Sequence, residues 1–159
     1  MVTVASLLAT LRDSGETVAT AESLTGGAIC AALTEVPGSS AVVRGGLVVY
    51  ATELKSSLAG VDAAMLDRYG AVHPEVAVQL AAGVRARCGA TWGLGLTGVA
   101  GPGRQDGVGA GTVYLALVGG ADDTRRSLRT LQVEGDRHTV RAAAVRAAME
   151  LLGGTKPSV

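Results

Sequence analysis

The chain has 159 residues, a length that predicts one domain with a sizeable core. Apolar residues make up 48% of it, but it has only one Trp, three Tyr and no Phe, so the core is expected to be aliphatic and platforms for stacking bases are scarce. Lys plus Arg and Asp plus Glu balance at 14 each, so no net charge favours binding to nucleic acid or to a membrane surface.

No apolar stretch approaches the roughly 20 residues that a membrane-spanning helix needs. The first apolar run is interrupted by Arg12 and Asp13, which favours a helix over a signal peptide. Cys30 and Cys88 lie in apolar stretches without CxxC spacing, a pattern typical of reduced thiols. We therefore expect a cytoplasmic protein.

Predicted helices and strands alternate along the chain. In chain order we expect a helix over 4–12, a strand over 17–21, a helix over 28–36, a strand over 47–50, helices over 52–58, 62–68 and 74–88, strands over 92–97, 112–118 and 127–133, and a helix over 136–152. This order predicts a single α/β (α+β) layered domain over residues 1–152, with one mixed sheet of about five strands flanked by helices on both faces. Residues 153–159 are expected to form a flexible tail.

The sharpest feature is the segment 21–27 (AESLTGG), where Ser23 lies at a bend between a strand and a helix. Free backbone N–H groups at a helix start, left uncovered by Gly26 and Gly27, suit an anion or an oxyanion. The layout is analogous to a nucleophile elbow, although the GxSxG pattern is absent. The alternative role of Ser23 is a helix N-cap, and the spacing alone favours the cap.

A serine nucleophile needs a base, and three residues are candidates. His73 precedes Pro74 at a helix start, and His138 lies in the first turn of the last helix, so both are more typical of cap or surface positions. Lys55 is the third candidate, because a lysine buried beside a serine can lose its proton near neutral pH. Its alternative is an exposed helix lysine.

Two further segments could bind a ligand. The loop 97–103 (TGVAGPG) follows a strand end, where α/β sheets place ligands, and it could instead be a flexible connection. Arg137 and Arg141 near a helix start could grip a phosphate or form a solvated basic face. The GxGxxG match at 93–98 lies in a strand and does not open a helix, so it does not predict dinucleotide binding. No spacing predicts a metal site.

Seven segments, in this order, resemble the C-terminal domain of the CinA (competence/damage-inducible protein) family. They are AESLTGG at 21–27, PGSS at 37–40, the strand and helix at 46–55, GAV at 70–72, TGVAGPG at 97–103, GTVY at 111–114 and GDR at 135–137. The resemblance covers roughly Val4 to Leu152. It implies a layered α/β domain and, in active members, an amidase that converts nicotinamide mononucleotide to nicotinate mononucleotide and ammonia without a metal or cofactor.

The resemblance also assigns roles to residues. Ser23 falls on the family's serine nucleophile, Lys55 on its lysine, and Tyr50 on a tyrosine near that pair. As a mechanism we expect neutral Lys55 to deprotonate Ser23, backbone N–H groups around Thr25 to hold the oxyanion, and the ribose phosphate to contact glycine-rich backbone and an arginine. The expected substrate-binding residues are Thr25, Gly26, Gly27, Thr97, Gly98, Gly101 and Arg137. A homo-oligomer, at least a dimer, is also implied.

The chain departs from the family pattern in two places. Leu24 stands where members commonly have Cys, and the loop 104–111 lacks the usual acidic stretch and Lys-Pro, which is expected to shorten the pocket wall and remove a cation. The resemblance does not extend to the molybdopterin-binding-like N-terminal domain of full-length members. Two alternatives to the mononucleotide amidase stay open: a catalytically silent nucleotide-binding or interaction module, and a hydrolase of another small amide.

Overall fold

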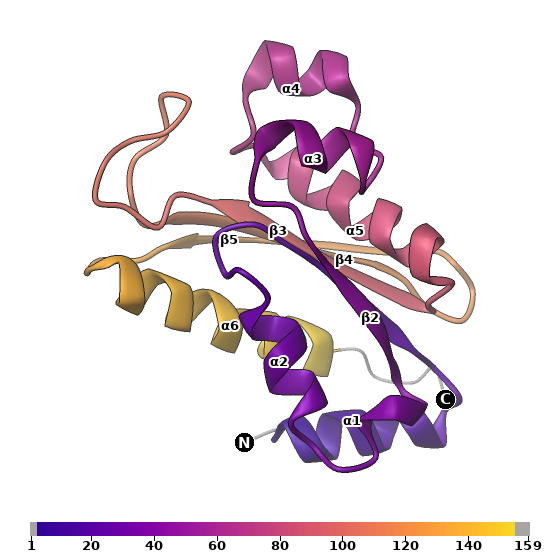
Figure 1. Cartoon of the computed structure of the whole chain (residues 1–159). Helices are drawn as coiled ribbons and strands as arrows, with labels where there is room; N and C mark the ends of the chain where they lie inside the picture. The colour runs from indigo at the N-terminus through magenta and orange to yellow at the C-terminus, as the bar shows by residue number, and fades with distance from the viewer. Residues whose placement is uncertain (1–2, 155–159) are drawn as a thin grey trace.

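A mixed sheet of five strands forms the centre of the structure, a computed structural model that describes residues 3–154 (Figure 1). Strands β2, β1 and β3 are parallel to one another, β4 is antiparallel to β3, and β5 is antiparallel to β4. The carboxyl ends of the three parallel strands therefore meet at one edge of the sheet. In spatial order the strands are β2 (Val43–Val48), β1 (Val18–Glu22), β3 (Trp92–Gly98), β4 (Thr112–Gly119) and β5 (Arg125–Gln132).

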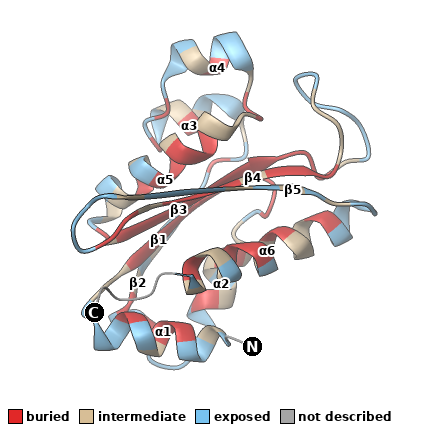
Figure 2. Cartoon of the chain, turned by 180° about the vertical axis from the view of Figure 1, so that it is seen from behind, coloured by how far each residue is buried: buried red, intermediate tan, exposed pale blue. Residues whose placement is uncertain are grey.

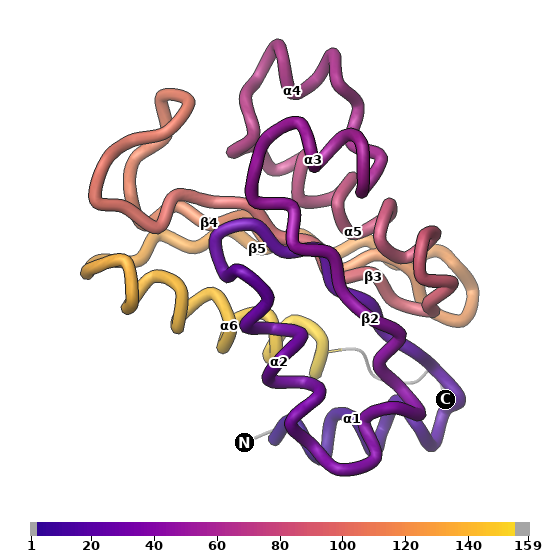
Figure 3. The backbone as a smooth tube through the Cα atoms, in the orientation of Figure 1, coloured from indigo at the N-terminus to yellow at the C-terminus, as the bar shows by residue number. Residues whose placement is uncertain are grey.

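Helices cover both faces of the sheet, as the alternating pattern predicts. On one face lie α1 (Val4–Asp13), α2 (Ala28–Thr34) and α6 (Arg137–Gly153), and on the other α3 (Thr52–Ser57), α4 (Ala63–Tyr69) and α5 (Pro74–Cys88) (Figures 1 and 3). A short 3₁₀ helix (Ser39–Ala41) precedes β2. Because both faces are covered, every residue of β1 and β3 is buried (Figure 2).

Helix α5 lies directly against the sheet because two glycines of β3 leave room for it. A Cβ atom on Gly93 would lie 1.9 Å from the carbonyl oxygen of Ala81, and one on Gly95 would lie 2.5 Å from that of Ala77. The predicted inner face of α5, formed by Val76, Leu80 and Val84, is completely buried. The glycines of the GxGxxG match therefore serve helix packing.

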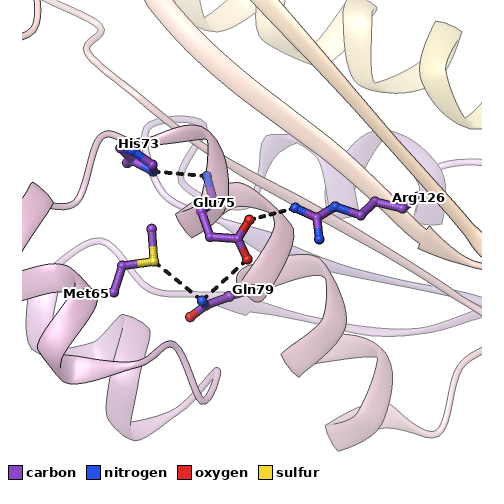
Figure 4. Close-up of polar contacts among 5 residues, drawn as sticks. All are labelled: Met65, His73, Glu75, Gln79 and Arg126. Atoms are coloured by element: carbon purple, nitrogen blue, oxygen red, sulfur yellow. Dashed lines mark hydrogen bonds and ion pairs between the residues drawn. The ribbon is translucent and has the colours of Figure 1, made fainter.

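A polar network ties α5 to its neighbours (Figure 4). Glu75 pairs with Arg126 of β5, with 2.6 Å between Oε2 and Nη2, and the side-chain amide of Gln79 donates to the sulfur of Met65 at 3.4 Å. His73 Nδ1 accepts from the N–H of Glu75 at 3.1 Å and so caps the start of α5. This histidine is a helix cap, as its position before Pro74 indicates.

The observed bounds differ from the predicted ones mainly at β2. The predicted strand 47–50 is replaced by Val43–Val48, because the ladder with β1 pairs Val43 with Val18 and Val48 with Glu22. Tyr50 therefore lies beyond the strand. The helix predicted to 36 ends at Thr34. Of the predicted tail, 153–154 end α6, and 155–159 lie outside the described residues. Within residues 3–154 no helix is long and apolar enough to cross a membrane.

Candidate active site

Ser23 follows β1 directly and faces a pocket at the carboxyl edge of the sheet. The residue is 7% exposed, and its hydroxyl makes no hydrogen bond within residues 3–154. No side-chain oxygen or nitrogen of the described residues is both fully buried and unpaired, so this hydroxyl reaches the pocket. The pocket has a volume of about 260 Å³ and is lined by Ser23, Leu24, Tyr50, Gly98, Val99, Ala100, Gly101, Gly103, Arg104, Gln105 and Arg137.

The carboxylate of Glu22 fills the anion-binding position at the start of α2. Glu22 is fully buried, and its Oε2 accepts from the hydroxyl of Thr25 at 2.7 Å and from the N–H groups of Gly27 and Ile29 at 3.1 and 3.0 Å. Its Oε1 accepts from the N–H of Cys30 at 2.8 Å. The helix N-terminus therefore holds the chain's own anion, which fixes the turn that carries Ser23.

This carboxylate corrects the predicted oxyanion donors. The N–H of Gly27 donates to Glu22, and that of Gly26 donates to the carbonyl oxygen of Ser23 at 3.1 Å, so neither is free. The N–H groups of Leu24 and Thr25 donate to no acceptor in the described part of the chain. Of the three predicted residues only Thr25 keeps an N–H without an acceptor, and none of the three lines the pocket; Leu24, which does line it, supplies a second such N–H.

Helix α6 also fixes the turn that carries Ser23, through the side chain of Arg141. The guanidinium of Arg141 donates from Nε to the carbonyl oxygen of Leu24 at 3.0 Å and from Nη2 to that of Thr25 at 3.1 Å. A pair of hydrogen bonds from one planar group fixes both position and orientation of the backbone. Arg141 thus positions the Ser23 turn, and it does not line the pocket with Arg137.

Lys55 lies on α3 with its side chain only 1% exposed. Its Nζ donates to the carbonyl oxygens of Val49 at 2.8 Å and Tyr50 at 3.2 Å. The N–H of Val49 in turn donates to the carbonyl oxygen of Glu22 at 2.8 Å, which connects Lys55 to the strand end that precedes Ser23. No hydrogen bond joins Lys55 to Ser23 in the described residues, and Lys55 is not among the residues that line the pocket.

Burial lowers the pKa of Lys55 to about 8, because an ammonium group loses hydration in the protein interior. The carboxylates of Asp106 and Glu53 act in the opposite direction, since nearby negative charge favours the protonated form. A lysine with this pKa is neutral in a useful fraction of molecules at physiological pH, which the predicted base requires.

Tyr50 and Arg137 meet at the pocket from different elements. The hydroxyl of Tyr50 accepts from Arg137 Nη2 at 2.8 Å, and Arg137 Nη1 donates to the carbonyl oxygen of Gly101 at 3.1 Å. Arg137 opens α6 beside Asp136, whose carboxylate caps the helix through the N–H of Thr139 at 2.8 Å. The structure therefore brings together five of the predicted residues: Ser23, Tyr50, Gly98, Gly101 and Arg137.

Thr97 has a different role from the predicted one. Its hydroxyl is buried and donates to the carbonyl oxygen of Ala71 at 2.7 Å, while the N–H of Ala71 donates to Asp106 Oδ2 at 2.9 Å. Gly70 is required here, because a Cβ atom on it would lie 2.6 Å from the Cβ of Asp106. Thr97 and Asp106 thus hold the segment Gly70-Ala71 between β3 and the pocket loop. Gly98, by contrast, lines the pocket as predicted.

Sequence reasoning missed one pocket residue of consequence in the loop 104–111. The loop was expected to remove a cation, whereas Arg104 lines the pocket. It does so because the loop folds back on itself through backbone hydrogen bonds between Gln105 and Val108 at 3.0 and 2.8 Å. No periodicity in this glycine-rich stretch could have placed that side chain. No group of three or more His, Cys, Asp or Glu residues in the described chain could hold a metal ion.

Comparisons with known proteins agree on one family. A family model described as the CinA C-terminal domain matches residues 2–155. CinA-like proteins of Frankia casuarinae and Myxococcus xanthus are 47% and 48% identical to this chain over 92% and 93% of its length. The matched regions are 33% and 35% of those relatives, so the chain spans about a third of the length of the curated relatives.

Solved structures give the same result. The crystal structure of a competence or damage-inducible protein from Enterobacter asburiae matches with a TM-score of 0.88 and 33% identity, over 98% of this chain and 100% of that one. That of a competence/damage inducible protein from Agrobacterium tumefaciens matches with a TM-score of 0.84 and 35% identity, over 94% and 93%. The ordered motifs, the fold and these matches together show that this chain belongs to the CinA C-terminal domain family.

Proposed function

We propose that this protein is an amidohydrolase that converts nicotinamide mononucleotide to nicotinate mononucleotide and ammonia, with Ser23 as nucleophile and Lys55 as base. The observation that carries the proposal is the hydroxyl of Ser23, which lies at the pocket without a hydrogen-bond partner in residues 3–154. A serine that served only as a helix cap would donate to or accept from the backbone of α2, and Glu22 does this instead.

The surroundings of Lys55 support its role as the base. A neutral amine has two N–H donors and one lone pair, and the carbonyl oxygens of Val49 and Tyr50 match the two donors. The lone pair is then left for a third partner, and in this proposal that partner is the Ser23 proton. The lowered pKa of about 8 makes this neutral form accessible near physiological pH.

The reaction then proceeds in two steps. Lys55 takes the proton of Ser23 as its oxygen attacks the carboxamide carbon, and the N–H groups of Leu24 and Thr25 are the available donors for the oxyanion. Collapse breaks the C–N bond, and the Lys55 ammonium returns a proton to the leaving nitrogen, which departs as ammonia. Water, deprotonated by Lys55, then attacks the ester carbon, the bond from that carbon to the Ser23 oxygen breaks, and the Lys55 ammonium returns its proton to Ser23 as the carboxylic acid leaves and ionises. Tyr50 and Arg137, joined by a hydrogen bond, form part of the pocket wall that would face the substrate.

A silent nucleotide-binding module is the competing function, and one observation favours it. Both hydrogen bonds of Lys55 Nζ go to backbone carbonyl oxygens, with none to Ser23 in the described chain. In that case Lys55 would remain a protonated structural group. Binding of nicotinamide mononucleotide without release of ammonia would identify this function.

The test is ammonia release from nicotinamide mononucleotide by purified protein. Ser23→Ala and Lys55→Met are each expected to lower kcat by about a thousandfold or more, because each removes a partner in proton transfer or bond formation. Lys55→Arg, which keeps the charge but cannot lose a proton, should be as inactive as Lys55→Met. Ser40→Ala, an exposed serine of the 3₁₀ helix, is the matched control and should retain full activity.

The outcomes separate function from mechanism. An active native protein whose activity survives in Ser23→Ala would refute the nucleophile but not the reaction. A native protein that releases no ammonia would refute the proposed function itself. Binding measured by isothermal titration calorimetry on Ser23→Ala checks that an inactive variant still takes up the nucleotide.

A further inference from the structure

Arg104 supplies a second cation to the lining of the pocket, in addition to that of Arg137. It belongs to the loop between β3 and β4, and its only hydrogen bond within residues 3–154 joins Nη2 to the carbonyl oxygen of Gly107 at 2.6 Å. The hydrogen bonds of Arg137 likewise go to uncharged oxygens, those of Gly101 and Tyr50. Both guanidinium groups therefore keep their full charge and several free N–H donors.

The pocket offers these two cations no counter-ion. None of its lining residues carries a carboxylate. Elsewhere in the described chain, Arg85, Arg126 and Arg129 each pair with an Asp or Glu side chain. A pocket with two cations and no anion attracts a negatively charged ligand, and the planar guanidinium fork matches the oxygens of a phosphate.

We propose that Arg104 binds the phosphate of the substrate together with Arg137, so that the pocket selects a nucleoside monophosphate over the unphosphorylated nucleoside. This inference rests on the proposed function and names the part of the substrate that the loop 104–111 recognises. Arg104 is thus a specificity-determining residue, supplied by a loop that differs from the family pattern. A phosphate monoester carries close to two negative charges near neutral pH, which matches the two guanidinium groups.

A purely structural role for Arg104 makes a different prediction. The bond from Arg104 to Gly107 closes a small turn, which the backbone hydrogen bonds between Gln105 and Val108 also close. If Arg104 only shaped this turn, its removal would disturb the pocket for every substrate alike. If it binds phosphate, its removal should affect only substrates that carry one.

The experiment compares nicotinamide mononucleotide with nicotinamide riboside, which lacks the phosphate. Arg104→Gln is expected to raise KM for the mononucleotide about tenfold or more, the loss typical of a charge-assisted hydrogen bond, and to change kcat/KM for the riboside less than about twofold. Arg104→Lys, which keeps the charge without the fork, should fall between the native protein and Arg104→Gln. Arg146→Gln removes the same charge from an exposed position of α6 outside the pocket lining and should match the native protein.

Three results would overturn the inference. Equal losses on both substrates in Arg104→Gln would assign the residue a structural role, and no loss on either would show that it is not used. If the native protein releases no ammonia, the proposed function fails, and calorimetric binding of the mononucleotide and the riboside replaces the kinetics. Weaker binding of the mononucleotide alone in Arg104→Gln would then still support the phosphate site, and failure of the native protein to prefer the mononucleotide would refute it.

Discussion

The two sides of the pocket are built in opposite ways. On the Ser23 side, hydrogen bonds from both ends fix the turn. The carboxylate of Glu22 accepts from the hydroxyl of Thr25 and the N–H of Ile29. Arg141 donates to the carbonyl oxygens of Leu24 and Thr25. On the loop side, residues 102–107 are exposed. The side chain of Asp106 connects this loop to the rest of the molecule by accepting a hydrogen bond from the N–H of Ala71.

This difference suggests a division of labour. The groups proposed for bond making and breaking are buried: Lys55 lies on α3, and Ser23 lies in the turn that directly follows β1. Packing in the interior fixes their geometry to within fractions of an ångström. The proposed phosphate contact at Arg104 comes from an exposed loop, where sequence can change at little cost in stability. Substitutions on the Ser23 side should therefore change stability strongly, and those on the loop side should change mainly substrate use.

The largest expected effect on stability is that of Glu22→Gln. The amide must place an NH₂ group where one carboxylate oxygen now accepts, for example at Oε1 opposite the N–H of Cys30 and the hydroxyl of Thr20. The hydroxyl can turn to accept from this NH₂ group, but the N–H of Cys30 would lose its acceptor and the remaining bonds their charge, so the free energy of unfolding should fall by about 3 kcal/mol. Urea denaturation followed by circular dichroism measures this change.

Glu75→Gln is the matched control for that measurement. It makes the same chemical change at the half-exposed ion pair with Arg126, where a surface salt bridge contributes less than about 1 kcal/mol. Similar losses at both positions would contradict the view that the Ser23 turn depends on its buried carboxylate.

Glu22 also shows where sequence reasoning stopped short. The bend at Ser23, the helix beginning at Pro74 and the cap at Asp136 could be predicted, because each depends on residues close by in sequence. The role of Glu22 could have been predicted, because an acidic residue shortly before a helix start can accept hydrogen bonds from the N-terminal N–H groups of that helix. In the prediction from the sequence, these N–H groups are instead free for the substrate. Asp106 could not be placed, since its position depends on contacts with Gly70 and Ala71, more than thirty residues away. Arg104 could not be placed either, because the turn that carries it lies in a glycine-rich stretch without periodicity.

The second prediction concerns the pH dependence of stability through Lys55. Its pKa is about 8 in the folded protein against 10.5 for an unperturbed lysine, so the unfolded chain binds more protons between these two values. The free energy of unfolding should therefore rise by about 3 kcal/mol from pH 8 to pH 10.5. Lys55→Met removes this rise, which denaturation of both proteins at several pH values would reveal.

Below pH 8 the difference between the two proteins should stop changing with pH. Lys55 is there largely protonated in both the folded and the unfolded chain, so the free energies of unfolding of the native protein and of Lys55→Met should run parallel. A parallel course from pH 8 to pH 10.5 as well would show that Lys55 is not the titrating group.

The smallest expected effect lies on the loop side, at Asp106. Asn at this position keeps an acceptor for the N–H of Ala71, so Asp106→Asn should change the free energy of unfolding by less than about 1 kcal/mol. It removes a negative charge that raises the pKa of Lys55, so the rising limb of kcat/KM against pH should move to lower pH. Glu53→Gln, which removes the other carboxylate acting on Lys55, should move the limb in the same direction by a smaller amount. If the limb moves in both variants, the charge of an exposed loop residue influences the pKa of the buried base. If it moves in Glu53→Gln but stays in place in Asp106→Asn, the loop has no electrostatic effect on Lys55.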